Sequence, residues 1–362
     1  MKKKDPIAAL LQNPMSYLYQ KKEKNIVAIS SRIRLARNIA QFPFPVTASV
    51  HDLAAVRNIV EDAVRDEKIL GAAGLGIYLD ELSELDREVL YERRLVSHKL
   101  ISSPLNRGLF LNGREQLAVM VNEEDHLRIQ SFLPGFQLKE AYKKASLADD
   151  KFGRRIDFAF DEKLGFLSSC PTNVGTGLRA SVMLHLPGLT LAGELESTVR
   201  ALNKLNFAVR GIFGEGSENV GSLYQISNQI TLGGSEEEII EKISETINKI
   251  IQYELEAREK MFARKQSHLM DFIGRSYGLL KYAYLLRSKE TLNALSGVKL
   301  GVDMGIFSNV TSEMVHKIYV NYGAAHLQKM YGRAFESNQA KSIFRADFVR
   351  GILRSVSADK ED

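Results

Sequence analysis

Cysteine and tryptophan are the scarcest residues in this sequence. The 362 residues include one cysteine, Cys170, and no tryptophan. A single thiol excludes an internal disulfide framework, and it also excludes a metal site built from several cysteines. The sequence therefore predicts a protein of a reducing compartment, and we expect it to be cytoplasmic.

Long apolar runs are missing as well. No stretch approaches the ~20 apolar residues that a membrane-spanning helix needs. The first apolar residues follow the basic run Lys2 to Lys4, but Gln12, Asn13 and Pro14 interrupt them too early for a signal peptide. We therefore expect no association with a membrane.

The excess of positive charge is small. The chain has 49 Lys and Arg against 44 Asp and Glu, which gives a net charge of +5. This balance suits nucleic acid, acidic proteins or a polyphosphate ligand equally well. The arginines recur inside short stretches rich in Gly, Ser and Asn, and this distribution favours a phosphate pocket over an arm that follows DNA.

The first two thirds of the chain alternate short apolar runs with turn signals. Between residues 26 and 232, for example, Leu109 to Leu111 precedes Asn112-Gly113, and Leu117 to Val121 precedes a charged turn. Helical patterns cover 53–64, with Asp52 as the expected cap, and 189–205. Because no βαβ spacing repeats, we predict an α+β fold.

The pattern changes after Gly233-Gly234. Ser235 and Glu238 have the spacing of a capping box, and isoleucines follow at helical intervals. Everything beyond indicates helix, with further starts near Ser288 and Ser312. We predict two domains, an α+β domain over 1–252 and an all-helical domain over 253–362, with the boundary between residues 252 and 266.

Short polar clusters are the candidates for chemistry, and each has an ordinary structural reading when taken alone. A Ser-Ser-Arg-Ile-Arg stretch is typical of an edge strand with solvated arginines, and a charged run is typical of a turn. A lone histidine is more often a satisfied surface or core residue than a ligand. The clusters are SSRIR at 30–34, NEEDHLR at 122–128, CPTNVGTGLRAS at 170–181, RGIFGE at 210–215, and the isolated His98.

The Gly175-x-Gly177-x-x-Ala180 spacing could also indicate a dinucleotide-binding turn. Two residues argue against that reading. Pro171 separates the glycines from the apolar run before them, and Arg179 lies inside the loop where a pyrophosphate would approach the backbone.

Phosphoryl transfer explains the clusters together. The reaction needs positive charge around three phosphates and a carboxylate that orients the nucleophile. Arginine forks that can clamp phosphate oxygens are present at Arg32, Arg34, Arg128, Arg179 and Arg210. No P-loop and no His-Arg-Asp or Asp-Phe-Gly set occurs. Glu124 and Glu215 suit a guanidinium acceptor, because a carboxylate can pair with its fork and accept the proton that it loses.

These four motifs, in this order, make the sequence resemble the phosphagen kinases, which are ATP:guanidino phosphotransferases such as arginine and creatine kinases. The resemblance covers most of residues 26 to 232. It implies a large antiparallel sheet flanked by helices, with ATP and Mg²⁺ as cofactors and no metal-ligating side chains that we can name. It also implies that Glu124 is the catalytic carboxylate, that Cys170 lies beside the guanidinium, and that Glu215 closes over it on a loop.

The resemblance also implies a nucleotide site. His98 corresponds to a histidine on the adenine side. The residues that it assigns to ATP are Ser30, Ser31, Arg32, Ile33, Arg34, His98, Arg128, Arg179, Ala180, Ser181, Val182, Met183, Arg210, Gly211, Ile212, Phe213 and Gly214.

Two departures from phosphagen kinases narrow the expectation. Those enzymes have a helical domain before the first arginine motif, but here the motif begins at Ser30, so we expect that domain to be absent and the acceptor pocket to be open. The helical region after residue 252 is also foreign to them. Both features, together with 188–193 and 224–232, resemble the bacterial protein-arginine kinases of this family.

That branch implies phosphorylation of arginine in proteins, in stress response and protein quality control. It implies a heat-shock repressor, an activator protein and an ATP-dependent protease as partners, no direct nucleic acid, and a homodimer through the C-terminal domain. The alternative is a small-molecule guanidino kinase, and a regulatory protein without catalysis is third. A nucleic-acid module is disfavoured because Phe213 is the only aromatic residue in the four motifs.

A third departure concerns phosphoarginine binding. The branch usually has an Arg-Asp-x-x-Arg-Ala motif that forms a phosphoarginine pocket in its helical domain. The corresponding stretch here begins Lys341-Ser342 and keeps only Arg345-Ala346. We therefore expect this chain not to respond to free phosphoarginine.

Overall fold

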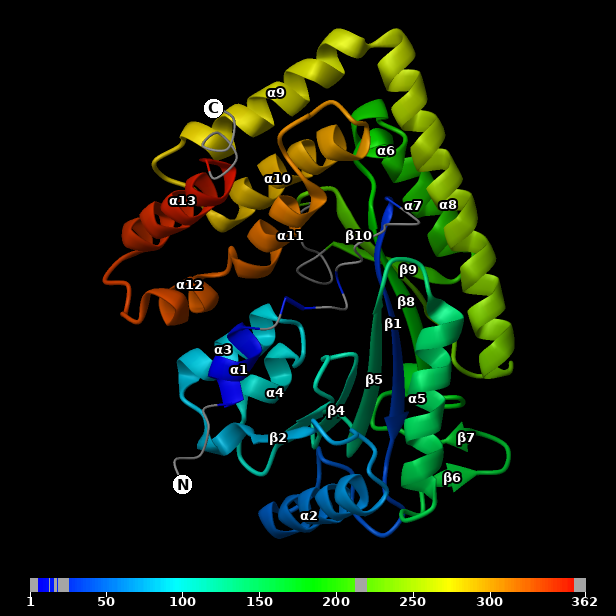
Figure 1. The fold of residues 1–362 in the computed structure, drawn as a ribbon. Coiled ribbons are helices and arrows are strands. Elements are labelled where there is room, and N and C mark those ends of the chain that lie inside the picture. Colours follow the sequence, from blue (N-terminus) through cyan, green and yellow to red (C-terminus); the bar gives the residue numbers. More distant parts are fainter. Residues whose placement is uncertain (1–5, 13, 16–17, 19–25, 212–219, 355–362) are drawn as a thin grey trace.

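The chain folds around one large antiparallel sheet (Figure 1). The computed structural model describes residues 6–12, 14–15, 18, 26–211 and 220–354. Eight strands lie in the order β2-β3-β4-β5-β1-β8-β10-β9, and every neighbouring pair is antiparallel. Their bounds are β1 Ala28–Arg37, β2 Leu75–Tyr78, β3 Gly108–Leu111, β4 Leu117–Val121, β5 Leu127–Pro134, β8 Leu178–His185, β9 Phe207–Gly211 and β10 Leu223–Asn228. A small second sheet pairs β6 Phe160–Asp161 with β7 Gly165–Phe166. The predicted α+β class with a large antiparallel sheet is confirmed.

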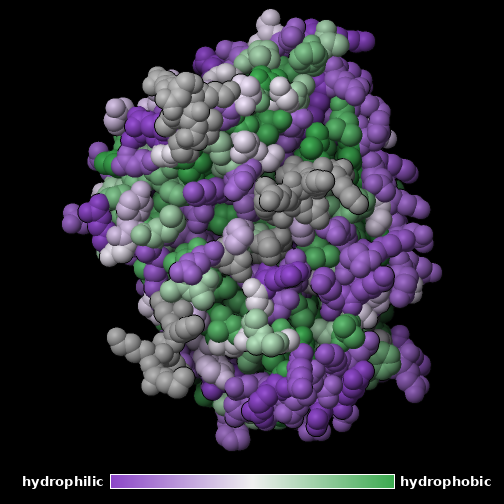
Figure 2. All heavy atoms as spheres, in the orientation of Figure 1, coloured by the Kyte–Doolittle hydropathy of each residue, from purple (hydrophilic) through white to green (hydrophobic). Residues whose placement is uncertain are grey.

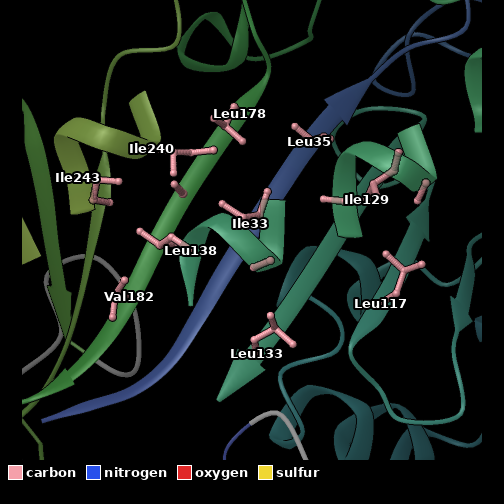
Figure 3. Packing of buried hydrophobic residues seen from close by; sticks show 14 of the residues in the cluster. Ile33, Leu35, Leu117, Ile129, Leu133, Leu138, Leu178, Val182, Ile240 and Ile243 are labelled. Carbon is pink, nitrogen blue, oxygen red and sulfur yellow. The ribbon is translucent and has the colours of Figure 1, made fainter. Parts of the chain in front are cut away.

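One face of the sheet carries the main apolar core. Alternate residues of β1, β8 and β5, such as Ile33, Val182 and Ile129, are fully buried because side chains alternate between faces along a strand. Helices α2 Val50–Asp66, α5 Leu138–Gly153 and α8 Glu236–Arg264 contribute to the same core. Figure 3 shows Leu138 and Ile240 of two of these helices close to the strand residues.

The helices that cover this core are amphipathic. In α8 the buried isoleucines recur at intervals of three and four, the spacing that places them on one side of a helix. Ser235 and Glu238 form the predicted capping box at its start. Hydrophilic residues line the right margin of Figure 2, where Figure 1 places α8. None of the described helices combines the length and apolar content that crossing a membrane requires.

The opposite face of the sheet is divided. Over β2 to β5 it is covered by α1 Pro6–Leu11, α3 Glu84–Glu92, α4 His98–Ser102 and the short 3₁₀ helix Leu79–Glu81. This second core also receives Val320 and Ala325 from the C-terminal helices. Around β1, β8 and β10 the same face carries polar and charged side chains.

The C-terminal region is helical, as predicted. It contains α9 Gln266–Tyr282, α10 Ser288–Asp303, α11 Ser312–Asn321, α12 Ala324–Tyr331 and α13 Asn338–Arg354. Residues such as Leu280, Leu295 and Val349 form its own core. Helix α8 runs unbroken through residues 252 and 253 and ends at Arg264, so the two regions share a helix; their division at residue 252 stays a prediction.

Two helix predictions were wrong in detail. Helix α2 begins at Val50 with Ser49 as its cap, and Asp52 is the third residue of the resulting capping box rather than the cap. The predicted helix over 189–205 is two helices, α6 Pro187–Ala192 and α7 Leu195–Lys204. Gly193 ends the first in a left-handed conformation, at φ 76°, which glycine adopts without strain.

Candidate active site

Five arginines from four strands share one face of the sheet. On β1, Arg32 and Arg34 alternate with the core residue Ile33, so their side chains point away from the apolar core. Arg34 lies directly opposite Arg179 of β8, and paired residues of neighbouring strands share a face.

The strand register brings the remaining two arginines to this face. On β5, Gln130 is paired with Arg34, so Arg128, two residues earlier, lies on the same side. At the other edge, Met183 is paired with Gln225, and Gln225 is paired with Arg210. The sequence prediction that these arginines form one group therefore has a geometric basis in the register.

Arg34 lies at the centre of this positive charge. Burial lowers the pKa of its guanidinium well below the ordinary value, and neighbouring positive charges lower it further. Those charges belong to Arg32, Arg128 and Arg179. Its Nε atom is buried and has no hydrogen-bond partner among the described residues. An anion with several oxygens would supply both the missing acceptor and the missing negative charge.

Strand β10 fixes the orientation of two other guanidinium groups. Arg32 donates from Nη2 to Oε1 of Gln225, at 2.8 Å. Arg179 donates from Nη2 to the hydroxyl oxygen of Ser227, at 3.1 Å. Gln225 and Ser227 are two residues apart on β10, so this strand holds the arginines of β1 and β8 in place.

The turn between β4 and β5 presents the carboxylates. Asn122 adopts φ 60°, and its side-chain amide donates to the backbone oxygens of Leu53 and Asn106, both at 2.8 Å. Asp125 accepts from Nδ2 of Asn38 at 2.7 Å. Asn122 and Asp125 are therefore structural residues that fix the turn.

Glu123 and Glu124 both face Arg128 but differ in their surroundings. Nη2 of Arg128 lies 2.6 Å from Oε2 of Glu123 and 3.2 Å from Oε2 of Glu124. Glu123 is buried and also accepts from the hydroxyl of Ser97 at 2.6 Å. Glu124 is 30% exposed, so it is the carboxylate that an incoming group can reach. Sequence reasoning missed Glu123, although its position beside Glu124 was a usable signal.

Cys170 is tied to this turn through a short chain of hydrogen bonds. Its backbone N–H donates to the hydroxyl oxygen of Ser168 at 3.1 Å, and that hydroxyl donates to Asp125 at 2.7 Å. The thiol is half-buried and lies 3.1 Å from the hydroxyl oxygen of Thr172. The structure thus brings the Cys170 segment next to the Glu124 turn.

The glycines after Cys170 serve chain packing. Gly175 has φ 111°, and a Cβ there would lie 2.3 Å from the backbone oxygen of Thr231. Gly177 has φ 64°, and a Cβ would lie 2.7 Å from the backbone oxygen of Ala36. The strand β8 follows them, whereas a dinucleotide-binding turn leads into a helix. The dinucleotide alternative is therefore excluded.

A cavity of about 370 Å³ lies in front of the arginine face. Of the residues predicted to bind ATP, those that line it are Ser30, Arg32, Arg34, Arg128, Ser181 and Met183. Its other walls include Tyr91 and Ser97 from the α3–α4 region. His98 lies beside Ser97, is exposed, and packs edge-on against Tyr91 with ring centres 6.0 Å apart.

Other predicted ATP residues lie elsewhere. The side chains of Ser31, Ile33, Ala180 and Val182 are buried on the core face, so only their strands, not their side chains, belong to the arginine face. Ser31 instead donates from its hydroxyl to the backbone oxygen of Gly135. Gly211 ends β9 next to Arg210. Ile212, Phe213, Gly214 and Glu215 fall outside the described residues.

This chain matches two protein families and is similar to several known proteins. Residues 55–257 match the family described as ATP:guanido phosphotransferase, C-terminal catalytic domain, and residues 266–362 match the protein-arginine kinase McsB C-terminal domain. A protein-arginine kinase of Halothermothrix orenii is 44% identical over 91% of this chain and 94% of its own. One of Bacillus subtilis is 42% identical over 93% of each.

A solved structure, that of lombricine kinase, covers 67% of this chain and 70% of its own with a TM-score of 0.56. Its sequence identity is 24%, so it supports the fold alone. The two sequence relatives each cover more than nine tenths of this chain. The chain therefore belongs to the ATP:guanido phosphotransferase family, in the branch that carries the protein-arginine kinase C-terminal domain.

Proposed function

We propose that this chain is a protein-arginine kinase, which transfers the γ-phosphoryl group of ATP to guanidinium groups of arginine in other proteins. The single observation that carries the proposal is Arg34, a guanidinium with a lowered pKa and an unsatisfied Nε beside three other arginines. It lies on the strand next to Arg128, which contacts Glu124. A polyphosphate and a cationic nucleophile fit these two parts of the site.

The arginine face holds the phosphates of ATP. Fixed guanidinium groups stabilise the negative charge that spreads over the phosphate oxygens during transfer, and they need no reorganisation because neighbouring strands already orient them. Removing one such donor from an enzyme typically lowers turnover by about 10² to 10³. His98, which packs against Tyr91 of the cavity wall, keeps its predicted role on the adenine side in this proposal.

Glu124 acts on the acceptor. A guanidinium nitrogen of the protein substrate attacks the γ-phosphorus, the bond from phosphorus to the β,γ-bridging oxygen breaks, and ADP leaves. The nitrogen must lose a proton as it reacts, and Glu124 accepts it. Glu123 engages Arg128 at 2.6 Å and so holds that cation between the phosphates and the carboxylates. Cys170, and Glu215 from its sequence position, take the predicted places beside the acceptor.

Magnesium enters with the nucleotide in this proposal. Among the described residues no group of three or more His, Cys, Asp or Glu side chains could hold a metal ion. Mg²⁺ is commonly bound through substrate phosphates and retained waters, with few protein ligands. The arginine face would then bind the Mg²⁺–ATP complex as its substrate.

The same proposal includes the setting implied by the branch. It comprises a cytoplasmic enzyme of stress response, a heat-shock repressor among its substrates, an activator protein, an ATP-dependent protease downstream, and a homodimer through the C-terminal helices. The named relatives are protein-arginine kinases, which supports protein substrates over small guanidino compounds.

The test is to incubate the full chain with ATP, Mg²⁺ and an unfolded protein, and to map phosphorylated residues by mass spectrometry under non-acidic conditions. We expect phosphate on arginine. Glu124→Gln should lower the rate about 10² to 10⁴-fold, as for loss of a positioned base. Because Glu124 acts on the acceptor, ATP affinity should stay nearly the same. Phosphate on free arginine alone, or near-normal turnover of the variant, would contradict the proposal.

A further inference from the structure

The cavity in front of the arginine face has a direction. Glu124 contacts Arg128, which is paired with Ala36 near the end of β1. From there the cavity follows β1 backwards past Arg34 and Arg32 to Ser30. The four steps along the strand from Arg34 to Ser30 span about 13 Å at ~3.3 Å per residue. If the γ-phosphate lies next to Glu124, the rest of the nucleotide must extend toward Ser30.

The chemistry of the cavity changes along this direction. Its Arg128 end is cationic, whereas Phe132 and Met183 line it on either side of the Ser30 end of β1. Met120, which is paired with Arg128, and Val96 also line the cavity, but they lie toward its Arg128 end. A charged end joined to an apolar end matches a nucleotide, whose phosphates and base have these two characters.

The C-terminal helices supply the wall opposite this apolar end. Val320 and Tyr322 at the end of α11, and Gly323 and Ala324 at the start of α12, line the same cavity as Arg32 and Arg34. We call residues 320–324 the α11–α12 corner. A region that the family comparison assigns to a separate C-terminal domain thus borders the site on the sheet.

The α11–α12 corner is fixed to α3 by one carboxylate. Glu92 accepts from the backbone N–H groups of Ala325 and His326, each at 2.9 Å, and lies 2.8 Å from Nδ1 of His326. A Cβ at position 323 would lie 2.2 Å from Glu92, so only glycine allows this approach. Arg94 also donates to the hydroxyl of Tyr319, at 2.5 Å. These contacts hold the α11–α12 corner in a fixed position beside the cavity.

We propose that the base and ribose of the bound nucleotide lie between Phe132 and Met183 of the sheet and the α11–α12 corner, with Tyr322 contacting the base. The C-terminal helices thereby form part of the nucleotide site and report whether it is filled. This inference rests on the proposed function in one respect, that the bound anion is ATP.

The test separates the two ends of the ligand. Calorimetric titrations of the full chain compare ATP with inorganic tripolyphosphate, each with Mg²⁺. Tyr322→Ala should weaken ATP binding roughly tenfold, the scale of losing one aromatic contact to a base. It should leave tripolyphosphate binding unchanged, whereas Tyr322→Phe should keep both. Tyr282→Ala, at an exposed tyrosine of α9 that does not line the cavity, is the control and should change neither.

A second measurement needs no variant, and it decides the matter if Tyr322→Ala does not fold. ATP, unlike tripolyphosphate, should slow amide hydrogen exchange over residues 318–327 of the unaltered protein. Equal protection by both ligands, or none by either, would overturn the inference, as would a Tyr322→Ala variant that binds ATP normally. If the unaltered protein shows these ATP effects but phosphorylates no arginine, the proposed function fails and the inference stands.

Discussion

Two sets of arginines in this protein face opposite requirements. Arg34 lies among like charges with its Nε unsatisfied. Three residues later on the same strand, Arg37 is buried, contacts Asp149 at 2.6 Å and packs over the ring of Phe166 at 3.5 Å. Arg93 likewise lies 2.6 Å from Glu115, with both side chains fully buried. The positive charge of Arg34 is available to a bound anion. The charges of Arg37 and Arg93 are paired with carboxylates of the protein and stabilise the fold.

The source of the counter-charge therefore distinguishes a binding arginine from a structural one. A buried ion pair gives its charges to each other, and its loss leaves one of them stranded. A cluster of like charges is unfavourable in the absence of an anion. Binding of an anion relieves this repulsion, and the cluster therefore favours anion binding. Variants of the two kinds of arginine should therefore differ in what they lose, stability of the fold in one case and turnover in the other.

Arg93→Met should lower the free energy of unfolding by about 3–5 kcal/mol, because it strands the buried carboxylate of Glu115. Burial already raises the pKa of Glu115, with Arg93 acting against that rise. Denaturant unfolding of the ligand-free chain measures the effect. The matched control is the double variant Arg93→Met, Glu115→Leu, which should recover much of the loss. A single variant as stable as the parent would contradict the assignment.

Arg34→Met should lower turnover and leave stability intact, the opposite of the effect expected for Arg93→Met. Turnover should fall about 10² to 10³-fold, the typical cost of one donor to the transition state. The ligand-free protein should be at least as stable as the parent, because the substitution removes one positive charge from a repulsive cluster. Steady-state kinetics and denaturant unfolding measure the two effects. A loss of stability like that of Arg93→Met would place Arg34 in the structural set.

Arg179→Ala and Arg210→Ala should weaken ATP binding and also lower turnover. Each loses charge-assisted hydrogen bonds, at about 1.5–3 kcal/mol, or roughly tenfold to a hundredfold in affinity. Lysine at either position should restore only part of the affinity, because an ammonium group cannot make the bidentate contact. Calorimetric titration with ATP is the measurement. Full affinity in both alanine variants would remove them from the phosphate clamp.

Free phosphoarginine should have no effect on the kinase activity of this chain. Arg345, kept from the usual motif, belongs to the structural set: it donates to the backbone oxygens of Tyr322 at 2.6 Å and Leu286 at 2.8 Å. Ser342 donates to the backbone oxygen of Asn338 and offers no carboxylate. Asp347, the acid that the sequence offers as a substitute, is paired with Arg350. Kinase activity should not rise with added phosphoarginine.

The matched variant is Lys341→Arg, Ser342→Asp in the full chain. Calorimetric titration should find an additional phosphoarginine site in this variant that the unmodified chain lacks. Stimulation of the unmodified chain would show that Lys341 and its neighbours suffice for recognition.

Much of the site could be predicted from the sequence because period-two alternation on strands is local. Arg32 and Arg34 had to share a face. The α+β class followed from the missing βαβ repeat, and the antiparallel sheet followed from the resemblance to phosphagen kinases. The same alternation explains why the predicted ATP-binding set was too large. It included Ser31 and Ile33, whose side chains are buried on the core face. Which residues of a strand point into the core depends on which face of the sheet the helices cover. That arrangement belongs to the tertiary structure and cannot be read from the strand sequence alone.

Features that depend on distant segments could not be predicted. The α11–α12 corner meets the cavity through Glu92 of α3, and no local pattern around Tyr322 indicates this. The split of the helix at Gly193 follows from a left-handed residue that an apolar pattern overlooks. Glu123 was missed because two adjacent acids look alike until burial separates them.

Helix α8 limits how this protein can exchange parts with its relatives. Its 29 residues extend about 43 Å, at ~1.5 Å per residue, from the sheet to the C-terminal helices. Glu254, within it, accepts the backbone N–H groups of Gly188 and Leu189, each at 2.9 Å, and Arg258 donates to the backbone oxygen of His185 at 3.3 Å. A chimera joined at residue 252 would have to inherit matching partners from both parents. Recombination should therefore succeed more often at residue 265, where α8 has ended, than anywhere inside it.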